Sequence, residues 1–122
     1  MSLLSPETTL AVQAAQQKNA QDIVLLNVGE HSSIADFFMI CTATNSRQVQ
    51  AISDGIQESL KLNGWRALGI EGYRQAEWIL LDYGDLVVHV FLAETRKFYD
   101  LERLWKNARK IPVPAEAAWQ AR

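Results

Sequence analysis

The chain has 122 residues, of which 48% are hydrophobic and 21% are charged, and its formal net charge is −2. This length predicts a single domain with a substantial core and is too short for two such domains. The weak negative charge argues against a broad nucleic-acid-binding surface. The single cysteine excludes an internal disulfide and a cysteine-based zinc site.

Targeting signals are weak. No apolar run approaches the length of a membrane-spanning helix. The first thirty residues contain one basic residue, Lys18, which argues against a signal or transit peptide. We therefore expect a cytoplasmic protein that does not enter a membrane. Cys41 lies in an apolar run, where a buried and inert thiol is expected rather than a nucleophile.

The first third of the chain predicts one helix and two strands. Ser5 and Pro6 form a helix start, because serine caps helix N-termini and proline suits the first turn. The helix should run to about residue 19 and be weakly anchored, because its apolar stripe is thin: Leu10, Ala11, Ala14 and Ala15. Residues 23–28 and 36–43 are predicted strands, the second apolar at nearly every position.

The middle of the chain predicts an amphipathic helix over residues 47–62. Polar residues 44–46 supply N-cap chemistry, and the pair Asn63-Gly64 is typical of a helix end. Apolar residues recur at spacings of three and four and form a buried stripe: Val49, Ile52, Ile56 and Leu60. Residues 65–70 are predicted to form a third strand.

Residues 77–92 predict a β-hairpin around which the chain is organised. Two apolar runs flank Gly84-Asp85, and Gly84 tolerates the positive φ that such turns need. Alternation along the first run places Ile79, Leu81 and Tyr83 on one face and Trp78, Leu80 and Asp82 on the other. Both faces of both strands are apolar, which predicts a position in the middle of a sheet.

The last predicted helix covers residues 94–108. One face should carry its apolar residues: Phe98, Leu101, Leu104, Trp105 and Ala108. Glu102 and Lys106 are spaced to pair across one turn. Prolines at 112 and 114 stop helix formation. We therefore predict one domain over residues 1–111 and a flexible C-terminal tail over residues 112–122.

The predicted order is α-β-β-α-β-β-β-α, an α/β fold with a mixed five-stranded sheet flanked by three helices. Three helices, one with a thin stripe, would cover such a sheet incompletely. Some large aromatic side chains should then stay at the surface, where amphipathic rings commonly anchor partners: Tyr73, Trp78, Tyr83 and Tyr99. For Trp78 a place in the core is an equally good interpretation.

Catalytic patterns are scarce. His31 lies in a polar turn, and His89 lies in an apolar strand, where a hydrogen-bonded packing role is commoner than catalysis. No nucleophile elbow or glycine-rich phosphate loop is present. Paired acids at i and i+2 on a strand, the usual arrangement for Mg²⁺, are also missing. Asp82 and Asp85 more plausibly fix the hairpin turn. We expect neither a metal nor another cofactor.

A basic cluster follows the last predicted helix: Lys106, Arg109 and Lys110. Cations there complement the negative end of a helix dipole, which explains them without a ligand. A minor contact with RNA is the alternative, although the cluster is too small to specify it.

The chain resembles the ribosomal silencing factor family, also called RsfS or Iojap. The matching stretches occur in family order and cover residues 36–41, 45–52, 71–72, 78–91 and 96–105, with the hairpin run WILLDYGDLVVHVF the most specific. One departure is Ala43, where the family usually has glycine before the second helix. The first helix and the tail carry no family signature.

The resemblance implies a fold like that of nucleotidyltransferases without their catalytic acids, and a function by binding. Family members bind ribosomal protein fourteen of the large subunit and sterically block the small subunit, which lowers translation under nutrient limitation. Many members form homodimers. The family's partner surface falls on Trp78, Asp82 and Tyr83, with Arg96 and Tyr99 from the last helix. The alternative function is a nucleotidyl- or phosphoryl-transferase using Mg²⁺ and a nucleoside triphosphate.

Overall fold

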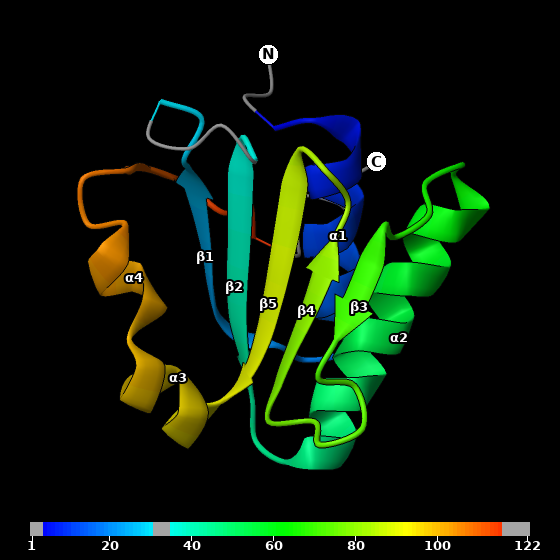
Figure 1. The fold of residues 1–122 in the computed structure, drawn as a ribbon. Coiled ribbons are helices and arrows are strands. Elements are labelled where there is room, and N and C mark those ends of the chain that lie inside the picture. The colour runs from blue at the N-terminus through cyan, green and yellow to red at the C-terminus, as the bar shows by residue number, and fades with distance from the viewer. Residues whose placement is uncertain (1–3, 31–34, 116–122) are drawn as a thin grey trace.

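The computed structural model describes residues 4–30 and 35–115 and contains one mixed sheet (Figure 1). Its strand order is β3-β4-β5-β2-β1-β6. The strands are β1 Gln21–Asn27, β2 Phe37–Ala43, β3 Gly69–Glu71, β4 Trp78–Asp82, β5 Leu86–Leu92 and β6 Arg109–Ile111. The sheet therefore has six strands, and the prediction of five was wrong. The additional strand, β6, pairs antiparallel with β1 at one edge.

The predicted hairpin is confirmed as β4 and β5, with Trp78 opposite Phe91 and Asp82 opposite Val87. Gly84 has a φ of 84°, and the Tyr83 amide donates to the carbonyl oxygen of Leu86. On its other side β5 pairs parallel with β2, so β5 lies in the middle of the sheet as predicted. The strand predicted over residues 65–70 is shorter and begins at Gly69.

Two helices cover one face of the sheet (Figure 1). Helix α1 is Pro6–Gln17, with the Ser5 side chain accepting from the Thr8 amide, and helix α2 is Ser46–Leu62. All four residues of the predicted α2 stripe are fully buried. Helix α1 buries the predicted alanines and also Val12, and it packs along α2. None of the described helices has the length and apolarity needed to cross a membrane.

The predicted last helix is broken in two, α3 Ala93–Tyr99 and α4 Leu101–Leu104. Asp100 lies between them with a φ of 47°, a left-handed conformation that aspartate tolerates better than most residues. Because of this break, the apolar side chains predicted to share one helix face no longer point in the same direction. Phe98 and Leu104 are 80% and 76% exposed, so the prediction that they share a buried stripe was wrong.

The second face of the sheet is only partly covered. Side chains after the break, including those of Leu101 and Trp105, pack against Phe38 and the β1 side of this face. Figure 1 shows α3 and α4 near β1 and β2, with no described helix in front of β3 and β4. The sheet is therefore incompletely covered by the described helices, as predicted, and the uncovered part is the β3 and β4 side of the second face.

The start of the predicted tail contacts the domain. Val113 packs against the main core cluster, and Gln16 Nε2 donates to the carbonyl oxygen of Pro114 at 2.7 Å. Residues 116–122 lie outside the described part of the chain. The boundary at residue 111 and the flexible tail stay predictions.

Candidate partner-binding surface

A continuous series of ring contacts crosses the second face of the sheet. The Trp78 indole on β4 stacks on Phe91 of β5, with ring centroids 4.8 Å apart. It also contacts Tyr99 of α3 at 5.0 Å, and Tyr99 in turn meets the Phe98 ring edge-on at 5.0 Å. The register explains the first contact, because side chains directly opposite in an antiparallel pair lie close together.

Trp78 is also held by a hydrogen bond. Its Nε1–H donates to His89 Nδ1 at 3.1 Å, so the proton of the neutral imidazole lies on Nε2. The histidine is 3% exposed, and Nε2 has no partner within the described structure. Burial lowers the pKa of His89 to about 4, so the ring is neutral at physiological pH. The predicted role of a hydrogen-bonded packing histidine is confirmed.

The series of rings opens to solvent at its α3 end. Trp78 is half-buried, Tyr99 is 54% exposed and Phe98 is 80% exposed. We call these three side chains the aromatic surface. Trp78 is packed against the sheet, whereas Tyr99 and Phe98 are exposed. Partly packed aromatic side chains of this kind are common contact residues for macromolecular partners. Trp78 is thus packed against the core yet not fully buried, and its role in partner binding stays a prediction.

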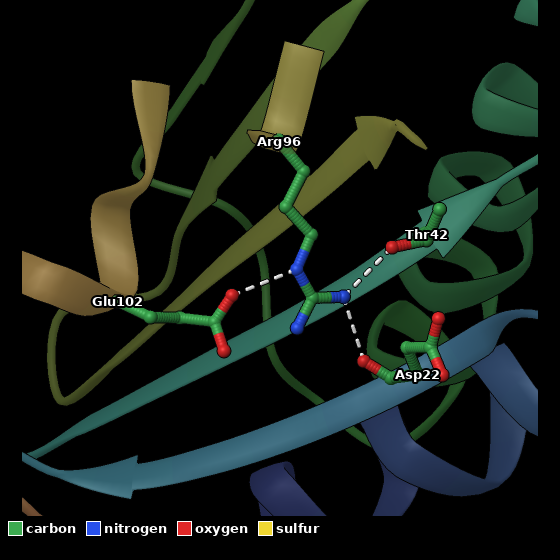
Figure 2. Close-up of polar contacts among 4 residues, drawn as sticks. All are labelled: Asp22, Thr42, Arg96 and Glu102. Atoms are coloured by element: carbon green, nitrogen blue, oxygen red, sulfur yellow. Dashed lines mark hydrogen bonds and ion pairs between the residues drawn. The ribbon is translucent and has the colours of Figure 1, made fainter. Parts of the chain in front are cut away.

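Arg96 fastens α3 to the sheet (Figure 2). Its Nη1 donates to the backbone oxygen of Asp22 and to Thr42 Oγ1, each at 2.7 Å, and its Nε pairs with Glu102 Oε1 at 2.9 Å. The Arg96 side chain is only 13% exposed. It therefore joins β1, β2, α3 and α4, and positions the aromatic surface rather than offering a free guanidinium. Glu102 does not pair with Lys106 as predicted, because α4 ends before Lys106.

Replacing Arg96 with methionine is expected to lower the free energy of unfolding by about 2–3 kcal/mol. The change keeps much of the aliphatic stem but removes charge-assisted hydrogen bonds and leaves the buried Thr42 hydroxyl without its donor. Urea unfolding measures the loss. The matched control is Lys106→Met, an exposed cation, whose effect should stay near zero. Equal losses in both variants would contradict the role given to Arg96.

The remaining predicted site residues lie elsewhere. Asp82 Oδ1 accepts from the Gly84 amide at 2.8 Å, which confirms its predicted role in the turn. Tyr83 faces the opposite side of the sheet and is 8% exposed, and burial raises its pKa. Tyr73 is 38% exposed, and its hydroxyl donates to Asp54 of α2, which raises the pKa of Tyr73. The six predicted residues therefore do not form one cluster.

The acidic side chains and the thiol were also considered as reactive groups. Across residues 4–30 and 35–115, no three His, Cys, Asp or Glu side chains are grouped closely enough to hold a metal ion. Cys41 is fully buried, and burial raises the pKa of its thiol to about 12, as expected of an inert cysteine. His31 lies outside the described residues.

Sequence reasoning missed Phe98 as a surface residue. Its helical spacing with Leu101 and Trp105 indicated a common buried face. The left-handed conformation of Asp100 interrupts the helix and turns Phe98 away from that face. The run Phe98-Tyr99-Asp100 held a usable signal, because aspartate is among the few residues that adopt the left-handed region.

Comparison with known proteins agrees with the resemblance. The family model described as "Ribosomal silencing factor during starvation" (RsfS) matches residues 4–122. The chain belongs to the ribosomal silencing factor family. A ribosomal silencing factor of Halalkalibacterium halodurans is 46% identical over 104 residues, covering 85% of this chain and 89% of that protein.

Two further relatives of this silencing factor family member extend the comparison. A crystal structure of a Chromobacterium violaceum protein has a TM-score of 0.81 and 34% identity, covering 89% of this chain and 90% of that one. A mouse protein named "Mitochondrial assembly of ribosomal large subunit protein 1" is 32% identical, covering 79% of this chain and 43% of the mouse protein. The mixed α/β architecture is thus that of a solved relative, while the likeness to nucleotidyltransferases stays an expectation.

Proposed function

We propose that this ribosomal silencing factor binds ribosomal protein fourteen of the large subunit and sterically blocks the small subunit. In the cytoplasm this would repress translation under nutrient limitation. Family membership carries the proposal, and the name of the mouse relative supports a partner on the large subunit. The aromatic surface is the part of the fold best suited to such a contact.

Trp78 and Tyr99 are the predicted partner residues that meet in the structure, and Phe98 joins them. Asp82 shapes the adjoining hairpin turn, and Arg96 positions α3. Tyr73 and Tyr83 face other parts of the molecule, and Tyr83 is buried, so their roles in partner binding stay untested predictions. The homodimer implied by the resemblance is likewise a prediction, which sedimentation of the free protein would test.

The test is subunit joining with purified ribosomal subunits in sucrose gradients. Adding the protein should lower the peak of joined ribosomes, and Tyr99→Ala together with Phe98→Ala should weaken this effect at least tenfold in concentration. Both side chains are largely exposed, so their truncation should spare the fold. The matched control is Leu62→Ala, another exposed apolar residue, 79% exposed at the end of α2. Unchanged joining with saturating protein would refute the proposed function.

No specific observation favours the alternative of a nucleotidyl- or phosphoryl-transferase. Of the acids considered for it, Asp82 is engaged by the Gly84 amide. Titration calorimetry with Mg²⁺ and nucleoside triphosphates would reveal such an activity through saturable heat.

A further inference from the structure

A second surface feature lies at the other end of the ring series. Beside α4 the chain forms a hollow of about 490 Å³, lined by Leu26 of β1, Trp105, one acidic residue, Glu102, and three basic residues: Arg103, Lys106 and Lys110. We call it the basic hollow. Arg103, Lys106 and Lys110 are all exposed.

Basic residues outnumber acidic ones in the lining of the hollow, three to one. The one acid, Glu102, is paired with Arg96, and the described residues show no ion pair that involves Arg103, Lys106 or Lys110. From residue 103 to residue 110 the sequence RLWKNARK contains four basic residues and no acid. The whole chain nevertheless has 14 acidic residues against 12 basic ones, so positive charge is concentrated here.

The structure removes the simplest explanation for these cations. A helix reaching residue 108 would have placed Lys106 and Lys110 at the negative end of its dipole, but α4 ends at Leu104 and has only four residues. Charges on an edge strand such as β6 protect it from pairing with other chains, which accounts for Lys110. Neither effect accounts for Arg103 and Lys106 converging on the same hollow.

A series of ring contacts links the basic hollow to the aromatic surface. Trp105 meets Phe38 at 5.1 Å, Phe38 meets His89 at 5.0 Å, and His89 meets Trp78 at 5.9 Å. Both features therefore lie on the second face of the sheet, at opposite ends of one series of rings. The proposed partner belongs to the large ribosomal subunit, which contains RNA, so phosphate groups would lie within reach of the basic hollow once the aromatic surface is covered.

We propose that the basic hollow binds the RNA backbone beside the protein partner on the large subunit. Arg103, Lys106 and Lys110 pair with phosphates, and the half-buried Trp105 offers a ring edge for a sugar or base. The proposal rests on the proposed function and adds a partner of different chemistry. It also explains how a protein of net negative charge is oriented as it approaches a polyanionic particle.

The experiment measures affinity for purified large subunits across a range of salt concentrations, using the full chain. Arg103→Glu combined with Lys110→Glu should weaken binding at least tenfold. It should also lower the slope of log K against log salt by roughly 1.4–1.8, since each lost phosphate contact contributes about 0.7–0.9. The matched control, Arg47→Glu with Arg66→Glu, changes the net charge equally at exposed positions away from the hollow and should leave the slope unchanged.

Binding to isolated ribosomal protein fourteen separates this proposal from the proposed function. The hollow variants should bind the isolated protein as tightly as the parent, whereas loss there would mean that the hollow contacts protein and would overturn the RNA assignment. An unchanged salt slope, or an equal change in the control variant, would also overturn it. The milder pair Arg103→Gln with Lys110→Gln guards against misfolding and should show a smaller loss in the same direction.

Discussion

Replacing Trp78 with alanine is expected to weaken binding to the large ribosomal subunit by about thirtyfold or more. The indole is stacked on Phe91, in contact with Tyr99 and hydrogen-bonded to His89, so these contacts hold the half-buried ring in one orientation. Truncating such a preorganised aromatic anchor typically costs about 2–4 kcal/mol of binding free energy. Each 1.4 kcal/mol is about tenfold in affinity. Equilibrium pelleting of labelled protein with large subunits measures the change.

The same substitution at Trp65 is the matched control. Trp65 is also half-buried, but it packs on the opposite face of the sheet and lines a hollow there with Tyr83. Both alanine variants should lose stability, because each removes a large packed ring. Only Trp78→Ala should lose affinity after correction for the unfolded fraction. A loss confined to Trp65→Ala would place the partner on the Tyr83 side and contradict the aromatic surface.

The elements that the sequence predicted well are those specified by local patterns. Helix α2 begins at an N-cap asparagine, Asn45, and buries a stripe with spacings of three and four. The β4–β5 hairpin follows from two apolar runs around Gly84, and its alternation correctly separated Trp78 from Tyr83. Such signals need no knowledge of distant residues. The periodicity of a helix is contained in its own sequence, and the two strands of the hairpin are joined by a short turn.

The parts that sequence reasoning missed depend on distant contacts. Strand β6 is three residues long and exists through its pairing with β1, more than eighty positions away, so no local periodicity predicts it. The resemblance placed Arg96 on the partner surface, and nothing near it in the sequence indicated its hydrogen bonds to β1 and β2, whose residues come far earlier in the chain. The sequence therefore suggested Trp78 and Tyr99 as candidate contacts, but the contact between their rings, the hydrogen bonds of Arg96 and the basic hollow emerged only from the structure.

Acidification is expected to destabilise the protein through His89. Burial lowers the pKa of this histidine from 6.5 to about 4, so between these values the unfolded chain binds a proton that the folded chain does not. The free energy of unfolding should therefore fall as pH drops from about 6.5 to about 4, by about 3 kcal/mol in total, and this contribution should level off below. Urea unfolding at a series of pH values measures it.

The variant His89→Asn isolates this contribution. Asparagine can still accept the Trp78 indole proton, at a position close to that of Nδ1, but it does not titrate. Carboxyl groups also titrate in this range, so the informative quantity is the difference between the parent and variant curves. That difference should shrink toward acid pH, because only the parent loses stability through the imidazole. A difference independent of pH would contradict the buried neutral state of His89, and with it the reason Trp78 keeps one orientation at physiological pH.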